Sequence, residues 1–190
     1  LTFTDDLKIE DNNALSSLNL SSLSFSRLTY VANNIALNTI SLSELSEVEY
    51  LDISNNSISQ ITLDNISSLQ FLRILEPQLN NISLSNLTTV LTNIEMFAGN
   101  LNSLDLPNLT SANQIQISNG SALTALNLPN LSSLHALSVG HINTVNDLDI
   151  NIPNLDLLDH LDLEVNSVST LNLNLPMITS LYMETVECQI

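Results

Sequence analysis

The hydrophobic residues of this chain recur at a fixed series of spacings. Over Leu51–Leu69 the aliphatic positions follow one another at steps of 2, 5, 3, 2, 3 and 3 residues. The segments Leu72–Val90 and Ile94–Ala112 repeat the same series of steps. An aliphatic pattern that returns unchanged predicts a repeat protein in which neighbouring units stack on one another.

Eight such units fit the chain at a mean spacing of 22 residues, and a ninth, partial unit begins near Leu181. Each unit contains two pairs of aliphatic residues separated by a single residue, such as Leu51/Ile53 and Ile61/Leu63. Alternation of this kind predicts β-strands, and the unit is too short for two helices. We therefore predict one coil of a β-solenoid per unit. The predicted coils start at Leu7, Leu28, Leu51, Leu72, Ile94, Ile115, Leu137 and Leu161.

A polar motif follows the second strand of several coils. The segment Leu106-Pro107-Asn108-Leu109 recurs as residues 128–131 and, with Ile in the first place, as residues 152–155. Residues 48–58 and 158–168 also fit the spacing L-x-x-L-x-L-x-x-N-x-L. The Asn of that spacing is expected at Asn12, Asn33, Asn56 and Asn166, and its place is taken elsewhere by Pro77, Gly99, Gly120 and Ile142.

These segments resemble the leucine-rich repeat. The second aliphatic pair, with L-P-N-L-x-S after it, resembles the receptor L-domain variety and is similar to fungal GPI-anchored cell-wall organisation proteins. The resemblance implies an all-β, single-domain, leucine-rich-repeat-type β-solenoid over residues 1–190, with about 8–9 coils. It also implies a cell-surface or cell-wall glycoprotein with an adhesion role. Bacterial or protist surface leucine-rich repeats are the alternative.

Composition and charge narrow the functional classes. The chain has 3 Lys plus Arg against 20 Asp plus Glu, a net charge of −17. So few cations cannot follow a phosphate backbone, and we expect no nucleic-acid partner. We also expect no direct membrane insertion, because no apolar run reaches the length of a membrane span and anionic lipids repel an acidic surface. Polar positions rich in Asn, Ser and Thr are typical of an extracellular or cell-wall protein. The chain starts without Met or a leader, so we expect a mature form or a fragment.

The titratable residues form no recognisable catalytic or metal-binding motif. His135, His141 and His160 do not have zinc-ligand spacing, and neither a nucleophile elbow nor a phosphate loop is present. The acidic stretch from Asp147 to Glu164 lacks a calcium-loop pattern, so we favour a solvated surface there. We therefore expect no cofactor, no metal and no enzymatic activity. The single Cys188 is expected to be a half-buried thiol, with a bridge to a partner or to another segment as the alternative.

Eight N-x-S/T sequons are candidate N-glycosylation sites if the protein is secreted from a eukaryote. Their number is close to the chance expectation for this composition, so it is no evidence in itself. They begin at Asn19, Asn55, Asn65, Asn81, Asn86, Asn108, Asn119 and Asn130.

The outward positions of the first strand of each coil form the most varied surface. All three basic residues are predicted to lie there, and in the second coil we expect Arg27, Thr29 and Val31 to face out. A chemically varied face is typical of a recognition surface. The candidate binding face consists of Tyr50, Asp52, Phe71, Arg73, Glu95 and Phe97. The second strands instead present a uniform predicted column of Asn19, Ser41, Thr62, Ser83, Asp105, Asn127, Asp149 and Asn172.

Three functions are compatible with these patterns. The first is a non-enzymatic extracellular module that binds protein or glycan through the first-strand face. The second is a structural surface protein that self-assembles by stacking its end coils into a homo-oligomer. The third, an ice-binding solenoid, would use the small polar side chains of the second strands.

Overall fold

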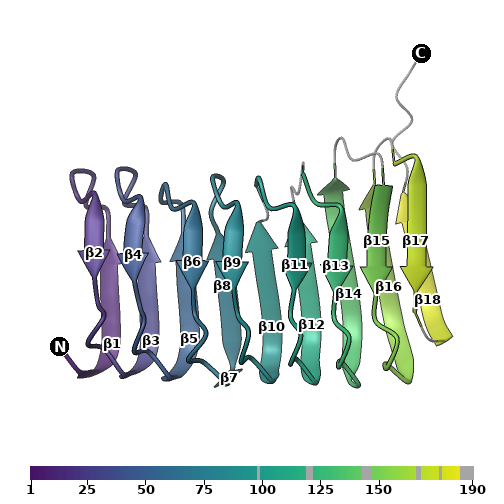
Figure 1. Cartoon of the computed structure of the whole chain (residues 1–190), viewed down its shortest axis with the longest axis horizontal. Helices are drawn as coiled ribbons and strands as arrows, with labels where there is room; N and C mark the ends of the chain where they lie inside the picture. Colours follow the sequence, from purple (N-terminus) through teal and green to yellow (C-terminus); the bar gives the residue numbers. More distant parts are fainter. Residues whose placement is uncertain (98, 119–121, 143–146, 166–167, 176, 185–190) are drawn as a thin grey trace, which may run out of the picture.

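The computed structural model describes residues 1–97, 99–118, 122–142, 147–165, 168–175 and 177–184. Figure 1 shows a straight stack of β-coils, with no helix in this part of the chain. Within these residues, eight coils each have a first and a second strand, and β18 supplies the first strand of a ninth. The all-β solenoid predicted from the 22-residue spacing is therefore confirmed.

The first strands of all coils join in one parallel sheet, which we call the long sheet. It has ten strands, in the order β1-β3-β5-β8-β10-β12-β14-β16-β18, with β7 also paired to β10. Parallel pairing without crossing connections follows directly from coiling, because each turn of the chain returns to the same side of the stack. The strands are β1 (Phe3–Glu10), β3 (Phe25–Ala32), β5 (Glu47–Ser54), β7 (Ser68–Leu69), β8 (Phe71–Leu75), β10 (Thr89–Phe97), β12 (Ser111–Ser118), β14 (Leu134–Ile142), β16 (Leu157–Val165) and β18 (Met177–Glu184).

The second strands form three separate sheets, which we call the short sheets. Their pairs are β2–β4, β6–β9 and the four-stranded set β11-β13-β15-β17. No backbone pairing joins β4 to β6 or β9 to β11 in the described chain, and Figure 1 shows wider gaps at these two places. The strands are β2 (Ser17–Asn19), β4 (Thr39–Ser41), β6 (Gln60–Thr62), β9 (Asn81–Ser83), β11 (Ser103–Asp105), β13 (Ala125–Asn127), β15 (Asp147–Asn151) and β17 (Thr170–Asn174).

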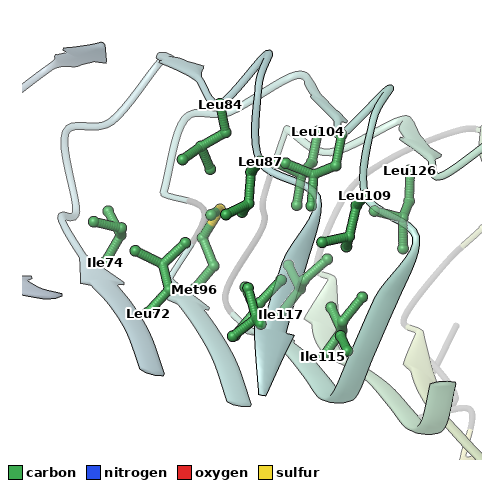
Figure 2. Close-up of a cluster of buried hydrophobic side chains, with 14 of the residues drawn as sticks. Leu72, Ile74, Leu84, Leu87, Met96, Leu104, Leu109, Ile115, Ile117 and Leu126 are labelled. Carbon is green, nitrogen blue, oxygen red and sulfur yellow. The ribbon is translucent and has the colours of Figure 1, made fainter. Parts of the chain in front are cut away.

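The core fills the space between the long sheet and the short sheets. Figure 2 shows how aliphatic side chains from successive coils pack in this space, with Ile115 and Ile117 pointing inward from one strand. Both of these residues are completely buried, as are Leu72 and Ile94 in earlier coils. Each such side chain stabilises the fold by roughly 1.5–3 kcal/mol. Neighbouring coils stabilise one another, because each coil covers the apolar side chains of the next.

The register of the second coil differs from the predicted one by a single residue. Thr29, not Leu28, pairs with both Leu7 and Leu51, and Thr29 is fully buried. Thr29 and Val31 therefore face the core, whereas Arg27 keeps an exposed guanidinium. The prediction failed because Leu28 satisfies the aliphatic pattern better than Thr29 does. The buried Thr29 hydroxyl has no hydrogen-bond partner.

A ladder of polar side chains joins the first four coils just after their long-sheet strands, exposed at Asn12 and buried at Asn34, Asn56 and Glu76. The Oδ1 of Asn34 accepts a hydrogen bond from the backbone N–H of Asn12 at 3.0 Å, and the Oδ1 of Asn56 accepts one from Asn34 at 3.0 Å. The ladder ends at Glu76, whose Oε1 accepts hydrogen bonds from the backbone N–H and the side-chain amide of Asn56 at 3.1 and 2.7 Å. These polar groups satisfy backbone donors that the turn would otherwise leave unpaired.

Two of the predicted ladder positions are wrong by one residue. The ladder contains Asn34 instead of Asn33, and Glu76 fills the place assigned to Pro77. Asn33 has a left-handed backbone with φ of 57°, a conformation that Asn tolerates better than most residues. Asp11 and Asn55 take the same conformation in their coils, at φ of 57° and 53°. Each of these residues turns the chain and directs the next side chain into the ladder.

The described residues include no helix that is both long enough and apolar enough to cross a membrane.

Candidate functional site

The six residues of the candidate binding face lie on three consecutive strands of the long sheet. Tyr50 pairs in register with Phe71, and Asp52 pairs with Arg73. Arg73 in turn pairs with Glu95 on β10. The structure therefore brings the predicted residues together, with aromatic side chains on either side of a row of charges.

Arg73 lies between two carboxylates. Its Nη1 is 3.6 Å from Oδ2 of Asp52, and its Nε is 3.5 Å from Oε2 of Glu95. These distances are longer than those of hydrogen bonds, and Nε has no hydrogen-bond partner. Asp52 is only 9% exposed, and its Oδ1 is also without a partner. The row of Asp52, Arg73 and Glu95 therefore has a net charge of minus one, so Arg73 is poorly suited to bind a carboxylate of a partner.

The aromatic residues of the face differ in exposure. Tyr50 is 37% exposed, whereas Phe71 and Phe97 are half-buried. The Tyr50 hydroxyl donates a hydrogen bond to Oε1 of Gln70 at 2.7 Å, and Nε2 of Gln70 donates one to Oε2 of Glu49 at 3.2 Å. This chain of contacts fixes the position of the Tyr50 ring, because Gln70 bridges the side chains of Tyr50 and Glu49 on β5.

All three basic residues of the protein are already in ion pairs. Lys8 Nζ lies 2.7 Å from Oε1 of Glu10 and 5.6 Å from the centroid of the Tyr30 ring. The hydrogen bond to Glu10 raises the pKa of Lys8 above its ordinary value. Arg27 pairs with Asp5 and Asp6 on the neighbouring strand.

A shallow groove beside Tyr50 contains residues that the sequence did not single out. It has a volume of about 290 Å³, and its lining includes Glu49 on β5, Gln70 before β8 and Leu91 on β10. Leu91 follows the buried Val90 at an outward position and is 64% exposed, like Glu49 and Asn113 at the matching positions of other coils. Strand β10 also carries a register shift between Val90 and Asn93. The signal in the sequence was the four-residue step from Val90 to Ile94, one residue longer than the step between the matching positions in the coil before.

No family model, curated protein or solved structure matches this chain. Its chemistry must therefore be argued from its own residues.

The second-strand column agrees with the prediction only as far as Asn127. In the register of the structure Asn127 pairs with Asn151, and Asn151 pairs with Asn174. Asp149 and Asn172 lie instead in the neighbouring column. The cause is a longer seventh coil, which shifts the register by two residues. An ice-binding lattice would need one continuous array of hydroxyls, and the three short sheets do not form such an array.

Four of the sequons coincide with a structural column at the turn after the second strand. The Nδ2 groups of Asn86, Asn108 and Asn130 donate hydrogen bonds to backbone oxygens of the preceding coil at 2.5, 2.7 and 2.6 Å, and Asn65 makes the same contact with Ser43. The hydroxyl of Thr110, two residues after Asn108, also donates to the coil before it. Both polar positions of the sequon are thus used to hold coils together. Among the other sequons, Asn19, Asn55 and Asn81 are exposed, and Asn119 lies outside the described residues.

The remaining titratable groups do not assemble into a second site. In the described chain no three His, Cys, Asp or Glu side chains gather closely enough to hold a metal ion. His135 Nδ1 lies 2.8 Å from Oδ2 of Asp159 on the adjacent coil. The pKa of Asp64 is lowered by hydrogen bonds from the Ser83 hydroxyl, the Ser85 backbone and the Ser85 hydroxyl. Cys188 and the side chain of His141 lie outside the described residues.

Proposed function

We propose that this protein is a non-enzymatic recognition module at the cell surface or in the cell wall, which binds protein or glycan through the long sheet. The coil length and the L-P-N-L motif further support a leucine-rich-repeat solenoid of the receptor L-domain type. A fold of this kind, similar to fungal GPI-anchored cell-wall organisation proteins, would place it outside the cell and give it an adhesion role. These assignments rest on residue patterns, because a solenoid supports many functions.

One observation carries the proposal. Tyr50 and Phe71 are neighbours in register on the long sheet, directly beside the row formed by Asp52, Arg73 and Glu95. Aromatic rings next to hydrogen-bonding groups can stack on a sugar face or pack against a partner's side chains. The outward positions of the short sheets carry mostly short polar side chains, such as Ser41, Thr62 and Asn127, and these sheets are interrupted twice. The long sheet is therefore the better recognition surface.

The test is the double substitution Tyr50→Ala with Phe71→Ala. Attachment to cells or cell walls of the source organism should fall by about tenfold, or about 1.4 kcal/mol. Arg73 is left in place because its removal would strand the nearly buried Asp52 and cost stability. The control, Leu157→Ala with Tyr182→Ala, removes exposed side chains from distant strands of the same sheet. Thermal melts check that both variants fold. If they then attach equally well, the binding site does not include Tyr50.

A second function, self-assembly by end stacking, is favoured by the two end coils. Phe3 on β1 is 64% exposed, and Met177 and Leu181 on β18 are 71% and 52% exposed. Strands β1 and β18 also have one unpaired edge each in the described chain, which is a template for another strand. A head-to-tail copy would cover both. Because the high negative charge opposes association, salt should promote it. Light scattering that finds a monomer at all salt and protein concentrations would contradict this function.

A further inference from the structure

We propose that the groove between β5 and β10 binds a Lys or Arg side chain of a cationic protein partner. The inference rests on the proposed recognition function, and it names the class of partner. The groove lies at the edge of the candidate binding face, since Tyr50 and Gln70 connect the two through a hydrogen bond.

The groove has an apolar floor and an acidic edge. Val48 and Leu69 are buried beneath it, and Leu91 forms an exposed apolar wall. Glu49 stands at the edge, where Gln70 holds one of its carboxylate oxygens at 3.2 Å. A long basic side chain could lay its methylene groups on Leu91 and place its charged end at Glu49, as such side chains do at other apolar surfaces.

The charges around the groove are unpaired and of one sign. Glu47 and Glu49 are both exposed on β5, and neither forms an ion pair with a described residue. The nearest basic residues are already committed, because Arg27 pairs with Asp5 and Asp6 and Arg73 pairs with carboxylates of its own row. In a protein of net charge −17, a ligand attracted to this place must be cationic.

The groove exists because the repeat is irregular here. The first strand of the fourth coil is interrupted at Gln70, and that of the fifth coil carries a register shift between Val90 and Asn93. Leu91 takes the outward position after Val90, where other coils carry polar residues such as Glu49 and Asn113. β-bulges are common beside functional sites. Departures from a regular pattern are likewise expected at functional sites, and here two of them lie in adjacent coils.

The size of the groove also favours a side chain over a glycan. Its volume of about 290 Å³ lies at the lower limit of small-molecule pockets. Its lining contains no aromatic ring on which a sugar could stack. A carboxylate with an aliphatic wall instead matches a guanidinium or ammonium group on an alkyl chain.

The test measures binding of two short labelled peptides by fluorescence anisotropy. One alternates Arg with Gly, and the other replaces each Arg by citrulline, which has a similar shape but no charge. The variant Glu49→Gln with Leu91→Ala should bind the Arg peptide at least about tenfold more weakly than the native chain. The matched control, Asp156→Asn with Leu157→Ala, also removes one exposed carboxylate and one exposed leucine, and should lose less than about twofold. The citrulline peptide should not bind.

Three results would overturn the inference. An equal loss of affinity in the two double variants would mean that the peptide is attracted only by the overall negative charge of the protein. Equal binding of the citrulline peptide would mean that charge is not recognised. If Tyr50→Ala with Phe71→Ala abolishes attachment to cell walls while the Arg peptide fails to bind native protein, the recognition function stands and its partner is a glycan. Both groove substitutions are at exposed side chains, so both variants should fold.

Discussion

At the residue scale, Glu76 is the most unusual side chain of the protein. Its carboxylate is completely buried, and it accepts hydrogen bonds from Asn56 and, through Oε2, from the backbone N–H of Ile58 at 3.2 Å. Burial raises the pKa of Glu76, while the hydrogen bonds from Asn56 and Ile58 act in the opposite direction. Glu76 therefore accepts the last hydrogen bonds of the ladder, at the cost of removing its carboxylate from water.

A raised pKa in the folded state gives stability a definite pH dependence. The contribution of Glu76 is fully present below its unfolded pKa and is lost as pH rises through the folded pKa. Relative to Glu76→Gln, which does not titrate, the native chain should therefore lose free energy of unfolding as pH rises from about 4.5, the ordinary pKa of Glu, into the range where the buried carboxyl ionises. Urea unfolding of both proteins across this range measures the difference, in which the other carboxylates cancel. A difference that stays constant with pH would mean that the folded pKa is not raised.

Removing the carboxylate altogether tests its structural role separately. Glu76→Ala leaves the backbone N–H groups of Asn56 and Ile58 without their acceptor. Each buried donor left unsatisfied costs about 1–3 kcal/mol. The Ala variant should therefore be less stable than the Gln variant at every pH, and equal stability would show that water takes over the carboxylate's role.

At the element scale, adjacent coils differ in how closely they approach. A Cβ added to Gly99 would lie 2.2 Å from the backbone oxygen of Pro77 in the coil before, a distance that requires the backbone to move. A Cβ at Gly140 would meet only the flexible carboxylate of Glu164, at 3.3 Å. The close packing of the fourth and fifth coils thus depends on the absence of a side chain at Gly99.

These two glycines provide a matched pair of substitutions. Gly99→Ala should destabilise the fold by about 1–3 kcal/mol through overpacking. Gly140→Ala should have little effect or stabilise slightly, because an unstrained Gly→Ala change restricts the unfolded chain. Denaturant midpoints measure both effects, and equal midpoints for the two variants would show that the turn at Gly99 relaxes freely.

The elements were largely predictable, whereas the exact partners were not. The aliphatic steps predict the strand pairs and the neighbouring positions of Tyr50 and Phe71. Residues one repeat apart in the sequence lie side by side when the coils stack. The burial of Thr29 and Glu76 was not predicted, because a buried polar residue can occupy an aliphatic or amide position when its coil shifts by one residue. Leu91 was not singled out because periodicity identifies the inward residues and does not say which outward residues line a groove.

At the scale of the whole molecule, the spacing of the coils limits what the surface can carry. Asn65, Asn86, Asn108 and Asn130 follow one another along the turn column, one per coil. Neighbouring strands lie about 4.8 Å apart, which is less than the width of a glycan. Glycosylation also replaces one of the two hydrogens on the Nδ2 group through which each of these Asn side chains contacts the coil before it.

Secretion from a eukaryotic host should therefore give incomplete occupancy of this column. We expect that no molecule carries glycans at two successive positions of the four, and mass spectrometry of intact protein and glycopeptides measures this. Asn65→Gln should raise the occupancy of Asn86 by removing its competitor. Full occupancy of all four positions on one molecule would contradict the steric limit.

The two interruptions of the short sheets have a mechanical consequence. A rod with one continuous sheet and one divided sheet does not resist bending equally in all directions. Beside the gaps at β4/β6 and β9/β11 the coils are joined by isolated backbone hydrogen bonds, from Ser57 N–H to the Leu37 oxygen and from Asn100 N–H to the Leu79 oxygen. Force that opens these gaps therefore meets fewer backbone hydrogen bonds than force that opens the continuous long sheet. The solenoid should therefore bend most easily at these two places, where the continuous long sheet joins three separate blocks of short sheet.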